Sequence, residues 1–152
     1  MQKLIIKGKK TLSGSIKISG SKNATLPILA AAILTDKTLI LKNIPFVQDV
    51  YTMINLLKFI GLSVKVSKKK NTLNISNNKK LKTVAPYNLL KTMRAGVLVL
   101  GPLLAKYNKA KVSLPGGCAI GARPVDLHLF ALEKLGAKIK IKNGYIHASA
   151  KN

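Results

Sequence analysis

The chain has 152 residues, of which 27 are Lys or Arg and 4 are Asp or Glu, so its formal net charge is +23. Because 47% of the residues are hydrophobic, this charge belongs to a folded basic protein and not to a disordered polycation. A single Cys excludes an intramolecular disulfide scaffold, and the longest apolar stretches, 24–34 and 96–105, are too short to span a membrane. The N-terminus lacks a signal-peptide core, so we predict a cytoplasmic protein with no membrane partner.

The cations are almost all lysines, since Arg94 and Arg123 are the two arginines among the 27 basic residues. Proteins that read nucleic-acid sequence usually rely on Arg for bidentate contacts. The lysines therefore favour a solvated surface, and the alternative is attraction of anions, either nucleic acid or phosphorylated metabolites. Because the lysines are spread along the whole chain, we expect any nucleic-acid binding to be non-specific and sensitive to salt.

The first half of the chain predicts a series of short elements. Residues 3–7 and 15–19 have the apolar pattern of strands, and Ser21 is placed to cap a helix that follows it. The spacing of Val50, Met53, Ile54, Leu57 and Ile60 predicts one buried helix face. In chain order we predict a helix over 21–34, a strand over 38–42, a helix over 47–60 and a hairpin over 62–76.

The second half repeats this order, with a helix over 86–106, a strand over 111–114, a helix over 124–135 and a hairpin over 137–149. Residues 56–66 and 131–141 are visibly similar, which indicates two units of roughly 70–75 residues each. The fold class is therefore α/β (α+β), built from repeated helix–strand–helix–hairpin units. Each such unit must pack on a neighbour to complete its core.

One difference between the units points to function. Pro45 and Gly61 are 16 positions apart, whereas Pro115 and Gly136 are 21 apart, so the second unit holds five more residues after its strand. The longer loop contains Gly-Gly-Cys-Ala-Ile-Gly-Ala-Arg at 116–123. An insertion at one place in a repeated scaffold is typical of a functional loop.

Three residues of this region are candidates for chemistry. Cys118 is either a buried structural residue or, since Gly117 and Arg123 are close in sequence, an accessible thiol with a lowered pKa. Arg123 precedes Pro124, which suits the first turn of a helix, so its cation and free N–H groups favour a phosphate. Asp126 either caps that helix or accepts a hydrogen bond from a sugar or base, and capping is the more general behaviour.

Other candidates lie at the starts of the two long helices. Lys22 and Asn23 begin the first, and Arg94 lies near the start of the second. A cation at a helix N-terminus costs stability unless an anion binds there, which indicates an anionic ligand. His128 and His147 have no metal-ligand spacing, and no nucleotide-binding glycine motif is present. We predict neither a metal nor a cofactor.

Three motifs together resemble the UDP-N-acetylglucosamine 1-carboxyvinyltransferase family of enolpyruvyl transferases. They are SGSKNA at 19–24, TMRAG at 92–96 followed by LGPLLA at 100–105, and PGGCAIGARPVDLH at 115–128. The related shikimate-pathway transferases share the family's fold but not this Cys loop. The resemblance implies an inside-out α/β barrel of repeated βαβαββ units in each of two domains. It also implies transfer of the enolpyruvyl group of phosphoenolpyruvate to the 3-hydroxyl of UDP-N-acetylglucosamine, with release of phosphate.

The resemblance also implies roles for particular residues. Cys118 would be the general acid towards phosphoenolpyruvate, and Lys22 and Asn23 would bind that substrate. Binding of UDP-N-acetylglucosamine would fall to Arg94 and to the run Arg123, Pro124, Val125, Asp126 and Leu127. The family more often has Ser at the position of Gly96, a difference from which we expect little.

The chain is less than half as long as members of this family. The resemblance assigns residues 1–20 to strands of the second domain and residues 21–152 to two of the three units of the first. We expect the chain to be inactive alone, and three interpretations stay open: an N-terminal fragment, half of a split enzyme with a separately encoded C-terminal partner, or a non-catalytic remnant. We also expect apolar helix faces, such as that of residues 97–104, to lack neighbours. A basic nucleic-acid-binding protein is the alternative function.

Overall fold

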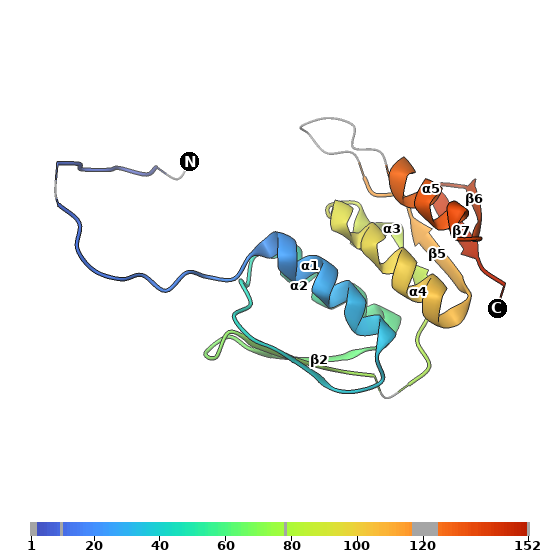
Figure 1. Ribbon diagram of the computed structural model, residues 1–152, viewed down its shortest axis with the longest axis horizontal. Helices are drawn as coiled ribbons and strands as arrows, with labels where there is room; N and C mark the ends of the chain where they lie inside the picture. Colours follow the sequence, from blue (N-terminus) through green and yellow to red (C-terminus); the bar gives the residue numbers. More distant parts are fainter. Residues whose placement is uncertain (1–2, 10, 78, 117–124, 152) are drawn as a thin grey trace.

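The computed structural model describes residues 3–9, 11–77, 79–116 and 125–151. Residues 3–9 and 11–20 form no helix or strand, so the strands predicted at 3–7 and 15–19 are wrong for this structure. This segment extends away from the rest of the molecule (Figure 1). Six of its large apolar side chains are at least 77% exposed, and a strand forms only where a second strand accepts its hydrogen bonds. Its assignment to a second domain stays a prediction.

The first unit follows the predicted order. Helix α1 (Lys22–Ala31) continues into the 3₁₀ turn η1 (Ala32–Leu34), and strand β1 (Leu39–Leu41) leads to helix α2 (Gln48–Ile60). The apolar face predicted for α2 is buried, and Gly61 ends the helix with a positive φ of 124°. Strands β2 (Ser63–Ser67) and β3 (Thr72–Ser76) form the predicted hairpin. β1 adds to it antiparallel, so the sheet order is β1-β3-β2.

The second unit contains one strand that the sequence did not reveal and a helix that is broken. β4 (Val84–Ala85) pairs parallel to β5 (Lys109–Ser113). Instead of one helix over 86–106, the chain forms α3 (Tyr87–Leu90), the 3₁₀ segment η2 (Arg94–Val99) and α4 (Leu100–Tyr107). Pro102 lacks an N–H and its ring would clash with the carbonyl of Leu98 in a continuous α-helix. The proline is tolerated because it lies in the first turn of α4.

The remainder of the second unit matches the first. Helix α5 (Asp126–Lys134) begins two residues later than the predicted start at Pro124, and strands β6 (Lys138–Lys142) and β7 (Tyr145–Ser149) form the predicted hairpin. The order of this sheet is β4-β5-β7-β6, with β5 antiparallel to β7 as β1 is to β3. The βαβαββ order expected for a unit is therefore complete in residues 84–149.

The two units pack through their helices, while the outer face of each sheet is turned to solvent (Figure 1). α1 packs on η2, and α4 packs on η1 and β5. The expectation that the 97–104 face would lack neighbours is wrong, because Val97, Val99, Leu100, Leu103 and Leu104 are at most 4% exposed. Lys106 also joins the units, since its Nζ lies 2.6 Å from Asp36 Oδ1 and donates to the Ile33 carbonyl at 3.0 Å.

Candidate active site

The start of α1 is fixed by two polar contacts. The Ser21 hydroxyl accepts a hydrogen bond from the Ala24 N–H at 3.3 Å, which is the predicted cap. Lys22 is the first residue of the helix, and its Nζ lies 2.8 Å from Asp49 Oδ2 in the first turn of α2. The pair ties the N-terminal ends of α1 and α2 together. Asn23 is exposed beside Lys22, so both residues predicted to bind phosphoenolpyruvate lie at one end of the helix layer.

Gly20 sets the path of the chain into this helix. A Cβ at Gly20 would lie 1.9 Å from the carbonyl oxygen of Asn43, a backbone atom that follows β1. Any other residue would therefore push the SGSKNA segment away from β1 and displace the start of α1. Gly20 is needed so that the backbone before α1 can pack against the backbone at Asn43. This packing fixes the position of Lys22 relative to the first sheet.

Arg94 begins η2 and is half-buried. Because η2 packs on α1 and the α3-to-α4 segment runs beside α1 in the same direction (Figure 1), both elements begin at the same end of the layer. The starts of α1, α2 and η2 therefore converge at one end of the molecule. N–H groups at the starts of helices carry partial positive charge, which adds to the cations Lys22 and Arg94 in favouring an anion.

Gly116 brings the entrance of the Cys loop to the same region. A Cβ there would lie 2.2 Å from the carbonyl oxygen of Lys91, the residue that ends α3. This close approach places Gly116, at the start of the 116–123 loop, beside the short segment that leads from Lys91 to Arg94. Cys118, Arg123 and Pro124 lie outside the described residues, so their predicted roles are not tested by the structure.

The far side of the loop is described from Val125 onward. Val125 is 5% exposed and precedes the first residue of α5, and its carbonyl accepts hydrogen bonds from the N–H groups of His128 and Leu129. Asp126 is exposed and is the first residue of α5, but no side chain in the described part of the chain caps this helix. The expected capping by Asp126 is therefore wrong. Leu127 is 82% exposed.

Sequence reasoning missed Asp49, Asn43 and Lys91, which position Lys22, Gly20 and Gly116. An acid in the first turn of a helix is common because it complements the helix dipole, so Asp49 carried no functional signal. Gly20 lies close to the Asn43 carbonyl and Gly116 close to the Lys91 carbonyl only in the folded structure. The glycines in SGSKNA and PGGCAIG were the sequence signal for these close approaches.

Among the described residues, no group of three or more His, Cys, Asp and Glu side chains could hold a metal ion. The helices in the described part of the chain also include none long and apolar enough to cross a membrane.

Comparison with known proteins decides the family. The model of the family described as EPSP synthase (3-phosphoshikimate 1-carboxyvinyltransferase) matches residues 6–152. The chain belongs to the EPSP synthase family. Within this family, its relatives include proteins named UDP-N-acetylglucosamine 1-carboxyvinyltransferase. The one from Pelagibacter ubique is 61% identical over 150 residues, and the one from Vesicomyosocius okutanii is 56% identical over 151 residues. Both alignments cover 99% of this chain and 36% of the relative, so the chain spans about a third of their length.

Solved structures of an enolpyruvyl transferase and of an EPSP synthase share the fold. The enolpyruvyl transferase NikO from Streptomyces tendae superposes with a TM-score of 0.77 at 17% identity, over 93% of this chain and 31% of that chain. An EPSP synthase from Acinetobacter baumannii superposes with a TM-score of 0.66 at 16% identity, over 90% of this chain and 32% of that chain. The predicted enolpyruvyl-transferase fold class is thereby confirmed.

Proposed function

We propose that this chain supplies part of the substrate cleft of a UDP-N-acetylglucosamine 1-carboxyvinyltransferase. The observation that carries the proposal is the 61% identity to a relative of that name, since the matching region includes the whole 115–128 motif with Cys118. The proposed reaction belongs to peptidoglycan synthesis and takes place in the cytoplasm. It supports cell-wall formation and therefore cell shape and division.

In the proposed reaction, Cys118 gives a proton to the methylene carbon of phosphoenolpyruvate while the sugar 3-hydroxyl adds to C2. A new C2–O bond to the sugar forms while the hydroxyl proton passes to a base supplied by the rest of the enzyme. The C2–O bond to phosphate then breaks as the new methyl group returns a proton to the Cys118 thiolate, which restores the double bond. Both substrates are anions. Lys22, Arg94 and the converging helix starts suit them because cations already in place need not reorganise as charge develops.

The division of labour proposed for the site is the one that the resemblance implies. Lys22 and Asn23, at the start of α1, bind phosphoenolpyruvate. Arg94 and residues 123–127 bind UDP-N-acetylglucosamine. Asp49 holds the Lys22 ammonium in place at 2.8 Å and is a positioning residue.

Calorimetric titration of the 152-residue chain with UDP-N-acetylglucosamine tests the binding part of the proposal. We expect measurable binding that Arg94→Gln weakens about tenfold, since a charge-assisted contact is lost. Lys65→Gln removes an exposed cation of the first sheet and should leave the affinity within about twofold. Equal weakening by both variants would show general attraction of anions and would contradict an assigned role for Arg94.

We further propose that turnover requires residues corresponding to the remaining two-thirds of the relatives' length, on the same chain or on a partner. Phosphate release from the two substrates should be undetectable with residues 1–152 and should appear when that remaining part of the Pelagibacter ubique relative is added. Steady release by residues 1–152 alone, abolished by Cys118→Ala, would contradict this requirement.

A further inference from the structure

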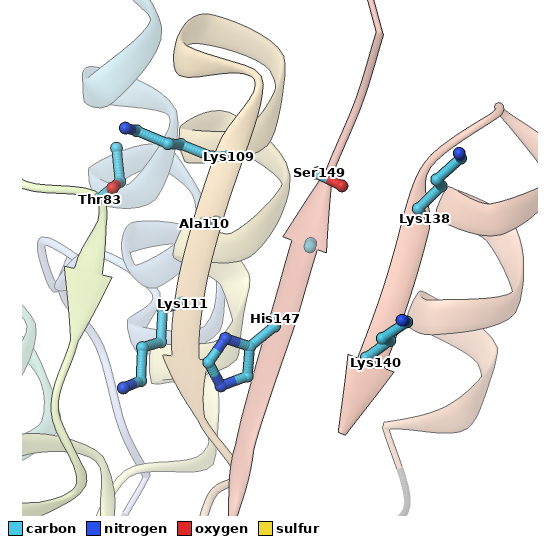
Figure 2. A pocket seen from close by; sticks show the side chains of 9 residues that line it. Thr83, Lys109, Ala110, Lys111, Lys138, Lys140, His147 and Ser149 are labelled. Carbon is cyan, nitrogen blue, oxygen red and sulfur yellow. The ribbon is translucent and has the colours of Figure 1, made fainter. Parts of the chain in front are cut away.

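The outer face of the second sheet forms a basic trough, defined by Lys109 and Lys111 of β5, His147 and Ser149 of β7, and Lys138 and Lys140 of β6. Strand alternation turns Ala110, Val112, Ile146 and Ala148 towards the helices and the trough residues towards solvent. The hollow has a volume of about 450 Å³, within the range of ligand sites. Figure 2 shows Lys109 and Lys111 on one side of β7 and Lys138 and Lys140 on the other.

The pairing register explains this arrangement. Lys111, His147 and Lys140 form one row across the three strands, and Lys109, Ser149 and Lys138 form the next. Like charges directly opposite one another destabilise a sheet, and here β7 separates the two lysine walls by two strand spacings, about 10 Å. The result is a channel along β7 with two cations on each wall.

No acid offsets these charges. The four acids of the chain are Asp36, Asp49, Asp126 and Glu133, and none lines the trough. Asp36 and Asp49 are paired with Lys106 and Lys22. The lysines therefore repel one another across distances comparable to the screening length of physiological salt, about 8 Å. An anion lying between the walls would relieve this repulsion.

We propose that this trough binds a linear chain of phosphates, such as inorganic polyphosphate, lying along β7. A single phosphate meets only the ammonium groups near one point of the channel, whereas a chain contacts several of them along its length. Lysine suits this ligand because it recognises phosphate as a point charge. The trough lies on the side of the sheet opposite α4, so this binding is independent of the proposed enolpyruvyl transfer.

The lining favours a phosphate chain over other polyanions. Single-stranded nucleic acid is usually held by exposed aromatic rings that stack on the bases. Among the described residues, the His147 imidazole is the one aromatic ring that lines the trough. The nearby Tyr145 ring is covered by Lys111, whose Nζ lies 4.7 Å from the ring centre. A membrane surface would favour exposed apolar side chains, whereas the apolar lining residues, Ala110 and Ala148, are at most 5% exposed.

The test is calorimetric titration of the whole chain with long-chain sodium polyphosphate at about 0.15 M salt. The variant Lys111→Gln/Lys140→Gln should weaken binding at least about tenfold and lower the slope of log affinity against log salt by about two. The control Lys42→Gln/Lys70→Gln removes the same charge from a second basic hollow, which Lys17 also lines. It should weaken binding less than about threefold.

Further titrations separate this proposal from its alternatives. Orthophosphate at the same phosphate concentration should not compete, and Lys109→Gln/Lys138→Gln, which changes the other row, should reproduce the loss. Circular dichroism should show that all variants are folded, as expected for exposed positions. Equal weakening by the Lys42/Lys70 control would show that the effect depends on net charge alone, and would contradict the proposal. Tighter binding of an oligothymidine or of anionic phospholipid vesicles, with the same dependence on Lys111 and Lys140, would overturn the proposal in favour of nucleic acid or membrane.

Discussion

The two sheets have the same core topology, but the outer row of the second is more basic than the equivalent row of the first. Ile40, Asn74 and Lys65 form a row across the first sheet, and Lys111, His147 and Lys140 form the equivalent row in the second. The sides that face the helices are apolar in both, with Val64, Leu73 and Ile75 in the first sheet and Ile139, Ile146 and Ala148 in the second. The repeated units therefore share what packing requires and differ where solvent or a ligand is met.

The largest expected effect in this comparison of the two units comes from Gly20 and Gly116, which lie against backbone carbonyls. Gly20→Ala and Gly116→Ala would each bring a Cβ within 2.2 Å of a carbonyl oxygen, which cannot move as a side chain can. We expect each to lower the free energy of unfolding by about 3 kcal/mol. Urea denaturation of both variants would measure the loss in each unit.

Gly101→Ala is the matched control for these glycines. It lies in α4 with nothing within 4 Å of its Cβ position, so alanine should raise stability by up to about 1 kcal/mol. If the three variants proved equally stable, the close approaches at Gly20 and Gly116 would not be real constraints.

The two ion pairs give the next largest contrast. Lys106, which joins the units, has a side chain 17% exposed, whereas the side chain of Lys22 is 47% exposed. Lys106→Met leaves the Ile33 carbonyl without its donor and should cost about 1–2 kcal/mol. Lys22→Met should cost less than about 0.5 kcal/mol. Thermal or urea unfolding would compare them, and a larger cost at Lys22 would show that this residue stabilises the fold more than its exposure indicates.

Much of the fold was predictable because its signals are local. The helix over 48–60 and both hairpins follow from apolar periodicity and from turn residues such as Gly61. The two-residue strand β4 was missed because it is too short to carry a pattern and forms only through pairing with β5. The 3₁₀ segment before Pro102 was missed because the helix-forming composition of 86–106 outweighed a single proline.

The site was predictable only in part. The motifs identified Lys22 and Arg94 at element starts, and the structure places them there. Neither Asp49 beside Lys22 nor the gathering of lysines on one sheet face was expected, since both depend on which strands and helices become neighbours. The sequence predicted lysines spread along both units. Strand alternation instead concentrates four of them in the trough.

At Gly96 this chain differs from the family that it resembles, which more often has Ser there. A Cβ there would lie 2.7 Å from Cγ of Leu90, which is a side-chain atom and is fully buried. Gly96→Ser should therefore cost about 1 kcal/mol, because Leu90 can shift within the core while Gly20 and Gly116 face backbone. Urea unfolding would measure it. A loss as large as that of Gly116→Ala would mean that the core around Leu90 cannot adjust.

The smallest expected effect concerns the loop that the first unit lacks. We expect a thiol-selective epoxide to alkylate Cys118, as the resemblance implies for the antibiotic fosfomycin when the enzyme is assembled. Arg123→Gln should slow the reaction about threefold at neutral pH. The prediction rests on the sequence expectation that Arg123 lowers the pKa of the thiol. On that expectation, removal of the cation raises the pKa, and a rise of one unit would leave about a tenth of the thiolate. The remaining thiolate is more basic and about threefold more nucleophilic, which offsets part of the loss.

Mass spectrometry of the modified peptide over time would give the alkylation rates of the unchanged chain and of Arg123→Gln. Lys65→Gln is the control for general charge. A simple thiol-selective epoxide of neutral charge should be used beside fosfomycin, because an anionic reagent would also lose its attraction to Arg123. If Cys118 reacts only after unfolding, the cysteine is a buried structural residue. The longer loop of the second unit would then differ from the first for packing and not for chemistry.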